Sequence, residues 1–457
     1  MARFLPPEEH LVLYETGFGE DILGRAPFGK NLSEIVERIE DPLVIALDGR
    51  WGTGKSHFLK RWVGAHKTQN EGRALTVYFD AFANDYLADP LVALVGSLTE
   101  RLKEERPEAN LSGLKNAAVK IIKPLARIGL NVATFGAKDA LGDLEDAFLD
   151  AAKGETDRAI ENLWQREEGR RAAMEEFHAA VSALTAPSAE GESSQPLAIV
   201  IDELDRCRPD YALEILEVIK HFFELPHVHF ILGVNLEVLE DSVRTRYGSG
   251  IDASAYLRKF LSFTMTLPED VGDQMRTPVL LRYIEDQGNL MGTPNHLLKA
   301  ISEQLRVWSR KNNISIREAG KILSWMAILP SKSHQSGFPV GLREVVITLV
   351  IIKVAIPNLY STFLNTSIDS MKLLDLLGLS EEVVSDKKAG KYIYSDEDNI
   401  AYNTFSVWMF ILNGDDPDRD RHWDWVASIF GRYHNMEDNR RIPRTVHRDY
   451  LSVFRLA

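Results

Sequence analysis

The chain has a single cysteine, no apolar run long enough to cross a bilayer and no internal repeat. Because Cys207 stands alone, no internal disulfide framework is possible, which favours a reducing compartment. The first residues include Arg3 and Pro6 rather than the apolar core of a secretion signal, so we expect a cytoplasmic protein. The longest apolar run, from Val345, extends for only about a dozen residues and contains Lys353, which predicts a buried helix instead of a membrane span.

Positive charge is outnumbered by negative charge. The 457 residues include 53 Lys and Arg against 67 Asp and Glu, which gives a net charge of −14. This balance disfavours a general nucleic-acid-coating protein, although a local basic patch is still able to bind phosphates. An apolar content of 45% and a charged content of 26% are those of an ordinary globular protein with room for two or three domains.

Glycines are concentrated in the stretch "PLVIALDGRWGTGKSHFLKRW", residues 42–62. Its apolar run, 43–47, predicts a strand that is buried on both faces. The eight residues from Gly49 fit the pattern G-x-x-x-x-G-K-[ST] at every fixed position. The residues that follow space Phe58, Leu59 and Trp62 on one face of a helix. Strand, loop and helix in this order are the context that a phosphate-binding loop requires.

The chemistry of such a loop accounts for its composition. Glycines let the backbone curl so that N–H groups point at a polyphosphate beside the positive end of the next helix. Lys55 then reaches the β- and γ-phosphates, and the Ser56 hydroxyl holds Mg²⁺. The alternative is a glycine-rich turn with an exposed lysine. The residues predicted to bind ATP are Gly49, Trp51, Gly52, Thr53, Gly54, Lys55, Ser56 and His57.

A second predicted strand supplies acid residues. Residues 197–201 form another apolar run, which ends in Asp202 and Glu203. A phosphate loop needs a carboxylate from a neighbouring strand to complete its magnesium site. We therefore expect Asp202 to bind Mg²⁺, together with Ser56, and Glu203 to polarise the attacking water. The alternative is a helix cap followed by a surface acid.

Two further strands are predicted, at 75–79 and 228–235. Asn235, at the tip of the later one, is expected to orient the water; otherwise it belongs to an ordinary strand-to-helix turn. Asp80 either joins the site or caps the next helix. Four strand-like segments that alternate with helices predict an α/β fold with a mostly parallel sheet, flanked by helices, and a ligand at the carboxyl ends of its strands.

Four segments taken together resemble the KAP family of P-loop NTPases: "GRWGTGKSHFL", "VYFDAFANDY", "VIDELDRCRPD" and "YLRKFLSFTMTLP". The segment "ILGRAPFGKNLSEIV" is similar to the part of the family that lies near the adenine. The resemblance implies an ASCE-type P-loop ATPase close to the STAND and AAA+ types, with ATP and Mg²⁺ as cofactors. It also implies a bacterial or phage-conflict setting, because several KAP proteins exclude phages.

ATPases of this class hydrolyse slowly until an arginine neutralises charge in the transition state. In AAA+ relatives this arginine lies at the end of the helix after the Asn235-type strand, where Arg244 and Arg246 fall. The alternative is a solvated helix end. Further candidates are Arg206, Arg258, Lys259 and, as a second sensor from the C-terminal helices, Arg317.

The domain organisation follows from these positions. Residues 1–275 are predicted to form the NTPase domain, with a helical insertion at about 105–190, and residues 276–457 a mostly α-helical regulatory or partner-binding domain. Within the insertion, residues 115–138 carry five basic residues and no acidic one. This segment either touches an anionic membrane, nucleic acid or a partner, or is a solvated helix face. His422, Trp423 and Trp425 are expected to be core and surface residues rather than a metal site.

The sequence thus predicts an ATP-hydrolysing switch that acts through oligomerisation or through operon-encoded partners. Two other functions stay open. A nucleic-acid-stimulated ATPase would show binding that weakens steeply with salt. A non-hydrolysing scaffold would bind ATP without turnover.

Overall fold

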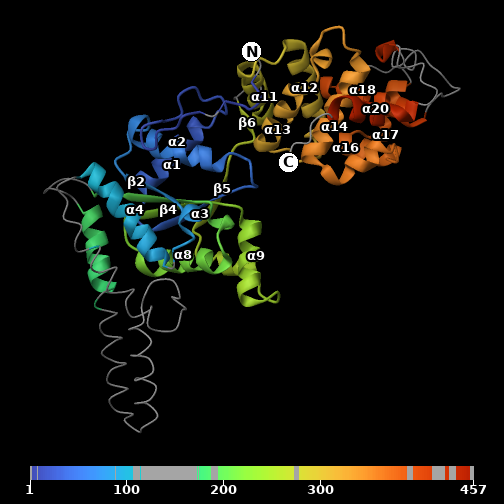
Figure 1. Cartoon of the computed structure of the whole chain (residues 1–457). Coiled ribbons are helices and arrows are strands. Elements are labelled where there is room, and N and C mark those ends of the chain that lie inside the picture. Colours follow the sequence, from blue (N-terminus) through green and yellow to red (C-terminus); the bar gives the residue numbers. More distant parts are fainter. Residues whose placement is uncertain are drawn as a thin grey trace, which may run out of the picture.

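The computed structural model describes residues 3–7, 9–87, 89–106, 114, 172, 174–186, 194–271, 277–388, 395–413, 428–431 and 439–452. Figure 1 shows two parts: an α/β lobe formed by most of the described residues up to 271, and a helical lobe formed by those from 277 onward. The N-terminus lies beside the helical lobe, where the N–H of Arg3 donates to the Met291 carbonyl at 3.0 Å. The basic segment 115–138 and the residues His422, Trp423 and Trp425 lie outside the described residues, as does most of the predicted insertion.

A five-stranded sheet with the order β2-β3-β4-β1-β5 organises the α/β lobe. Its strands are β1 (Leu43–Asp48), β2 (Leu75–Asp80), β3 (Leu197–Asp202), β4 (Val228–Val234) and β5 (Phe263–Thr266). All four neighbouring pairs are parallel. The register places Asp202 beside Asp80 on one side and beside Gly233 on the other. The carboxyl ends of the central strands therefore lie side by side at the same end of the sheet. The predicted α/β fold is confirmed.

The fifth strand was not predicted from the sequence. β5 is an edge strand, and Phe263, Thr264 and Thr266 along it are exposed. It consequently lacks the continuous apolar run that marks the central strands, which are buried on both faces.

Helices cover both faces of the sheet (Figure 1). On one face lie α1 (Ala26–Arg38) and α2 (Lys55–Thr68); on the other lie α4 (Pro90–Glu105), α8 (Pro209–Phe222) and α9 (Leu236–Tyr247). Successive strand residues point to opposite faces. In β3, Val200 accordingly joins the apolar cluster of α1 and α2, whereas Ile199 and Ile201 join that of α4 and α8.

Short elements connect this framework. They are α3 (Ala81–Asn84), the 3₁₀ turn η1 (Leu204–Arg206), α10 (Ala253–Leu257) and the two-stranded ladder of β6 (Asp270–Val271) and β7 (Thr277–Pro278). The turn η1 follows β3 after Glu203, so it lies at the carboxyl ends of the strands.

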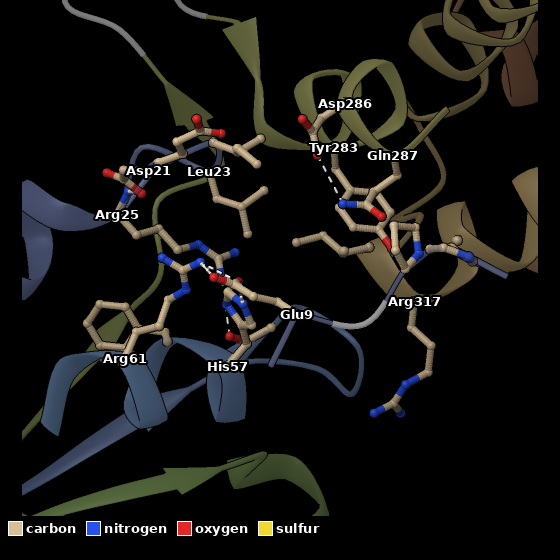
Figure 2. A pocket seen from close by; sticks show the side chains of 18 of the residues that line it. Glu9, Asp21, Leu23, Arg25, His57, Arg61, Tyr283, Asp286, Gln287 and Arg317 are labelled. Carbon is tan, nitrogen blue, oxygen red and sulfur yellow. Dashed lines mark hydrogen bonds and ion pairs between the residues drawn. The ribbon is translucent and has the colours of Figure 1, made fainter. Parts of the chain in front are cut away.

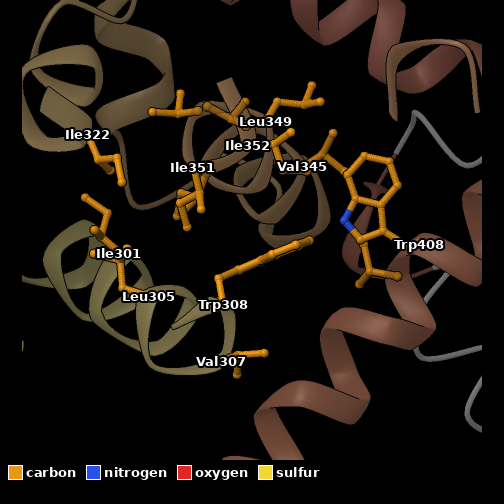
Figure 3. Packing of buried hydrophobic residues seen from close by; sticks show 14 of the residues in the cluster. Ile301, Leu305, Val307, Trp308, Ile322, Val345, Leu349, Ile351, Ile352 and Trp408 are labelled. Atoms are coloured by element: carbon orange, nitrogen blue, oxygen red, sulfur yellow. The ribbon is translucent and has the colours of Figure 1, made fainter. Parts of the chain in front are cut away.

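The helical lobe has its own apolar core. Figure 3 shows Trp308, Val345 and Trp408 packed together inside it, and all three are buried. The run from Val345 forms part of α14, which is buried along most of its length as predicted. Among the described residues, no helix combines the length and the hydropathy needed to span a membrane. The helices are α11 (Val279–Leu290), α12 (Asn295–Trp308), α13 (Ile316–Ala327), α14 (Val340–Ala355), α15 (Tyr360–Leu364), α16 (Ser370–Leu377), α17 (Glu381–Lys388), α18 (Asp396–Asn413) and α20 (Ile442–Val446).

Candidate functional site

The glycine loop joins β1 to α2 at the carboxyl edge of the sheet. Gly52 and Gly54 have φ values of +87° and +88°, which only glycine adopts without strain. α2 begins at Lys55, so the first N–H groups of this helix, which lack partners within the helix, lie at the loop. Such a helix start attracts anions through its N–H groups and its dipole.

The Lys55 side chain folds back over the loop. Its Nζ donates to the carbonyl oxygens of Gly49 and Arg50, the latter at 3.2 Å. Burial lowers the pKa of Lys55, whereas the nearby carboxylates of Asp205, Asp202 and Asp48 raise it. The ammonium group therefore lies within the curve of the loop, bonded to two carbonyl oxygens.

Asp202, the last residue of β3, lies beside the glycine loop. Its side chain accepts hydrogen bonds from the Tyr78 hydroxyl at 2.6 Å and from the Glu203 N–H at 2.9 Å. Burial raises the pKa of Asp202, and the hydrogen bonds from Tyr78, Ser56 and the Glu203 N–H lower it. The two residues predicted to hold Mg²⁺, Ser56 and Asp202, also line the same cavity.

This pair of oxygen donors fits Mg²⁺, which proteins usually hold through one or two side chains together with phosphate oxygens and water. Within the described ranges, no group of three or more His, Cys, Asp or Glu residues is arranged to hold a metal by itself. A magnesium ion at Ser56 and Asp202 would therefore take its remaining ligands from a bound polyphosphate and water.

Glu203 has an unusual backbone and a charged partner. Its φ of +60° lies in the left-handed region, which costs energy for a residue with a side chain and which is concentrated at functional sites. The carboxylate pairs with Arg206, whose Nη1 lies 2.9 Å from Oε2. Burial raises the pKa of Glu203, while the guanidinium of Arg206 lowers it.

A cavity of about 260 Å³ runs along the loop. It contains Lys55, Ser56, Asp202 and Glu203, so the structure brings together the residues predicted to bind phosphate, hold the metal and activate water. Of the predicted nucleotide-binding residues, Gly49 and Thr53 do not line this cavity. Its full lining is Trp51, Gly52, Gly54, Lys55, Ser56, His57, Asp202, Glu203, Asp205, Arg206, Gly233, Ile316 and Arg317.

Other predicted site residues lie elsewhere in this chain. Asn235 precedes α9 at the end of β4 but is not part of the cavity lining. Arg244 pairs with Glu240 at 2.7 Å and with Asp241, and Arg246 lies 3.3 Å from Asp210. The structure therefore does not bring Arg244 and Arg246 to their own loop.

Asp80 and Arg258 also have local partners. The Asp80 side chain accepts a hydrogen bond from the Ala83 N–H at 2.8 Å, so it caps α3. Arg258 donates to the Ser254 hydroxyl at 2.9 Å. The Lys259 ammonium lies 5.6 Å from the centre of the Tyr256 ring. Of the candidate arginines, Arg206 and Arg317 are the two that reach the cavity.

Sequence reasoning missed several contacts of the site. The Tyr78 hydroxyl holds Asp202, and a Cβ on Gly233 would lie 2.6 Å from Asp202 Oδ1. The Trp51 indole Nε1 donates to Asp205 Oδ2 at 2.5 Å. Arg25 donates to the loop from the start of α1. These contacts depend on packing between separate elements. Tyr78, Trp51 and Arg25 lay in segments that the sequence singled out as family-like, but the sequence did not show their partners.

A second, larger cavity of about 810 Å³ adjoins the loop at Gly54 and His57. Figure 2 shows it between the N-terminal segment, α2 and the helices α11 and α13, with Tyr283 on the side of the helical lobe. Glu9 pairs with Arg61 and with His57 there, the latter at 3.2 Å. Arg317 points away from this group in Figure 2, and it lines both cavities.

The helical lobe touches the loop directly. The N–H of Arg317, in the first turn of α13, donates to the Gly52 carbonyl at 3.2 Å. A Cβ added to Gly52 would lie 2.8 Å from Cβ of Arg317 and 2.9 Å from Oγ of Ser315. The loop thus supplies a partner for one of the N–H groups that α13 itself leaves free.

A glycine loop with its lysine and hydroxyl, placed between a central strand and a helix beside a strand that ends in acid residues, defines a P-loop NTPase. The family model described as the KAP family P-loop domain matches residues 25–331, so the chain belongs to the KAP family. The match confirms the resemblance seen in the sequence, and it extends beyond the sheet into α11–α13.

Solved structures with similarity to the whole chain include the ORC2 protein of Aeropyrum pernix. The structure of its ADPNP–ADP complexes is 12% identical, with a TM-score of 0.33, and the alignment covers 93% of this chain and 88% of that one. Its ADP form is also 12% identical, with a TM-score of 0.31, and the alignment covers 97% and 95%. No curated protein sequence matches the chain at a significant level.

Proposed function

We propose that this KAP-family protein binds ATP with Mg²⁺, hydrolyses it and changes conformation or assembly with the nucleotide state. The observation that carries the proposal is that Ser56 of the loop and Asp202 of β3 line one cavity together with the buried Lys55. A loop, a lysine and an acid strand that converge on one cavity suit a magnesium-bound polyphosphate better than any other ligand class.

Each residue has a role in this proposal. Lys55 leaves the carbonyl oxygens of the loop and pairs with the β- and γ-phosphates. When bound by Ser56 and Asp202, Mg²⁺ would neutralise phosphate charge. Glu203 accepts the proton of the water that attacks the γ-phosphorus, once its carboxylate is free of Arg206. The nucleoside occupies the larger cavity, which adjoins the loop at Gly54 and His57.

The contact between α13 and the loop supports a nucleotide-dependent change. Arg317 contacts Gly52 through its backbone, and its side chain lines the same cavity as Lys55. A polyphosphate in that cavity attracts the guanidinium, because the two charges are opposite and the lining is partly buried. We therefore assign Arg317 the role of a sensor that reports nucleotide state to the helical lobe.

Partners and setting belong to the same proposal. A second copy of the chain, or operon-encoded proteins, would read the change in the helical lobe. Arg244 and Arg246 lie on the surface at the end of α9, where they are available to a neighbouring copy. The family resemblance supports a role in anti-phage defence. Expression of the wild-type protein should then lower the plating efficiency of a sensitive phage, and Lys55→Ala should restore it.

The direct test is nucleotide binding and turnover by the purified protein. Wild type should bind Mg²⁺·ATP and release phosphate; Lys55→Ala should lose both. Glu203→Gln should retain binding and lose turnover, because the amide cannot accept the proton. The proposal is wrong if wild type and Lys55→Ala show the same calorimetric titration with Mg²⁺·ATP and the same rate of phosphate release.

One observation favours a second candidate, a switch that binds ATP without hydrolysing it. The pair between Glu203 and Arg206 occupies the carboxylate that would activate water. If this pair persists with ATP bound, Glu203→Gln changes neither binding nor turnover, and both the wild type and this variant keep their ATP intact over hours.

A further inference from the structure

Arg25 makes a contact with the loop that the glycine pattern does not predict. Its Nη2 donates to the Thr53 carbonyl at 2.7 Å and its Nη1 to the Gly54 carbonyl at 3.1 Å. The side chain is almost fully buried, with 4% exposed, and within the described part of the chain its Nε has no hydrogen-bond partner. A buried guanidinium is costly to desolvate, so its retention against two carbonyl groups calls for an explanation.

The backbone of Arg25 is fixed as firmly as its side chain. The Asp21 carboxylate accepts the N–H groups of Arg25 and Ala26, at 2.8 Å and 2.6 Å, where α1 begins. A Cβ on Gly54 would lie 2.7 Å from Nη1 of Arg25. Gly54 is therefore required both for its positive φ and for the close approach of the guanidinium.

The geometry of the peptide bond gives this contact its consequence. In a trans peptide the C=O and N–H bonds point in opposite directions. The guanidinium holds the carbonyls of Thr53 and Gly54, and so it fixes the peptide units that carry the N–H groups of Gly54 and Lys55. Among the described residues, neither of these N–H groups donates to an acceptor. They remain free on the side of the loop opposite to Arg25.

We propose that Arg25 is a positioning residue for the phosphate loop. Its guanidinium holds the carbonyls of Thr53 and Gly54, so that the N–H groups of Gly54 and Lys55 already point toward a bound polyphosphate. This inference rests on the proposed function. Arg25 touches the carbonyl side of the loop and acts through its peptide units. The affinity for any ligand that carries the phosphate chain, with or without a nucleoside, should therefore depend on Arg25.

The experiment compares Arg25→Ala and Arg25→Lys with wild type, and it uses two probes, Mg²⁺·ADP and inorganic tripolyphosphate. Arg25→Ala should weaken both probes roughly 10- to 100-fold, because hydrogen bonds from a charged group are lost. Arg25→Lys should recover part of this loss, since an ammonium keeps the charge but cannot hold two carbonyls in a fixed fork. Titration calorimetry measures each affinity.

Arg343 provides a matched control. It too is a buried arginine; its Nη2 donates to the carbonyls of Gln335, Ser336 and Phe338, and its Nε has no partner within the described residues. It lies in α14 of the helical lobe, outside both cavities. Arg343→Ala and Arg343→Lys should cost stability as the Arg25 variants do, yet bind both probes like wild type.

The outcomes separate this inference from the proposed function. If either folded Arg25 variant binds tripolyphosphate as tightly as wild type does, or loses affinity for ADP alone, Arg25 does not position the loop. The lysine variant decides the question if Arg25→Ala does not fold. A wild-type protein that binds neither probe overturns the proposed function, and this inference with it.

Discussion

The indole Nε1 of Trp51 lies 2.5 Å from Oδ2 of Asp205, so the tip of the glycine loop is tied to the turn that follows β3. Trp51 is half exposed, whereas Asp205 is buried. The bond joins the two segments that carry Lys55 and Glu203, and any movement of the loop changes it.

Trp51 should therefore report nucleotide binding. ATP that draws the loop inward alters the surroundings of this indole, and we expect a change in emission when Mg²⁺·ATP is added. Trp51→Phe should abolish most of that change and weaken ATP binding several-fold, because a neutral donor to a carboxylate is lost. An equal fluorescence response in wild type and Trp51→Phe would place the change at another of the eight tryptophans.

Gly233 is predicted to be intolerant of any side chain. A Cβ there would lie 2.6 Å from Oδ1 of Asp202 and 2.6 Å from Cδ1 of Leu59, so Gly233→Ala must displace the carboxylate that we propose as a metal ligand. We expect the Mg²⁺ concentration for half-maximal ATP binding to rise at least tenfold in this variant. Gly96→Ala is the control, because its Cβ meets nothing within 4 Å on α4. That change should leave binding intact and stabilise the fold by about 0.5–1 kcal/mol. Equal Mg²⁺ dependence in both variants would contradict the assignment of Asp202.

Arg317 should matter for ligand response and not for the resting fold. Its side chain is exposed and has no hydrogen bond or ion pair with the residues that the structure describes. Arg317→Ala should thus change the free energy of unfolding without ligand by less than about 0.5 kcal/mol. The rise in melting temperature on addition of Mg²⁺·ATP should shrink. Arg282→Ala, at an exposed position on α11 and outside both cavities, should preserve that rise. A full thermal shift in Arg317→Ala would remove Arg317 from the site.

Glu37 should make the α/β lobe sensitive to acid. Its Oε1 accepts hydrogen bonds from Ala74 N–H at 2.7 Å and Arg73 N–H at 2.6 Å, and it lies 3.1 Å from Nε2 of His66. Burial alone raises the pKa of Glu37, but these hydrogen bonds outweigh it and lower the pKa to about 2. A carboxyl whose pKa is lowered on folding stabilises the fold fully above its ordinary value near 4.5, and this stabilisation is lost as the pH falls toward 2.

We expect this loss to amount to about 2 kcal/mol between pH 6 and pH 2.5, after allowance for partial exposure. Glu37→Gln should remove that part of the pH dependence, measured by urea unfolding at several pH values. Glu34→Gln, at an exposed position on the same helix, should keep it. Parallel pH profiles for wild type and Glu37→Gln would show that this carboxylate does not stabilise the fold.

The sequence was sufficient to predict the centre of the fold and of the site. Each of β1, β3 and β4 is an apolar run bounded by polar residues, and the phosphate-loop pattern fixes Lys55 and Ser56 because its spacing is set by backbone geometry. The strand that supplies the acid residues was predicted from an apolar run that ends in Asp202. In each case the signal is local, so neighbouring residues in the chain carry it.

The remainder depends on contacts between distant segments. Tyr78 faces Asp202 only because β2 pairs with β3, and Arg25 reaches the loop only because α1 packs beside α2. The edge strand β5 lacks an apolar pattern, because its residues are exposed. Arg244 and Arg246 were placed by analogy to relatives, and in this chain they pair with acids of α9 and α8 instead.

The closeness of Gly52 to Ser315 and Arg317 has a mechanical consequence. The two segments are already in contact, so the glycine loop has no free space on that side, and a shift of its backbone must be accommodated by the start of α13. α13 is a continuous helix whose apolar face packs against the core of the helical lobe. A displacement of the glycine loop would therefore press on the start of α13 and, through the apolar face of this helix, on the core of the helical lobe.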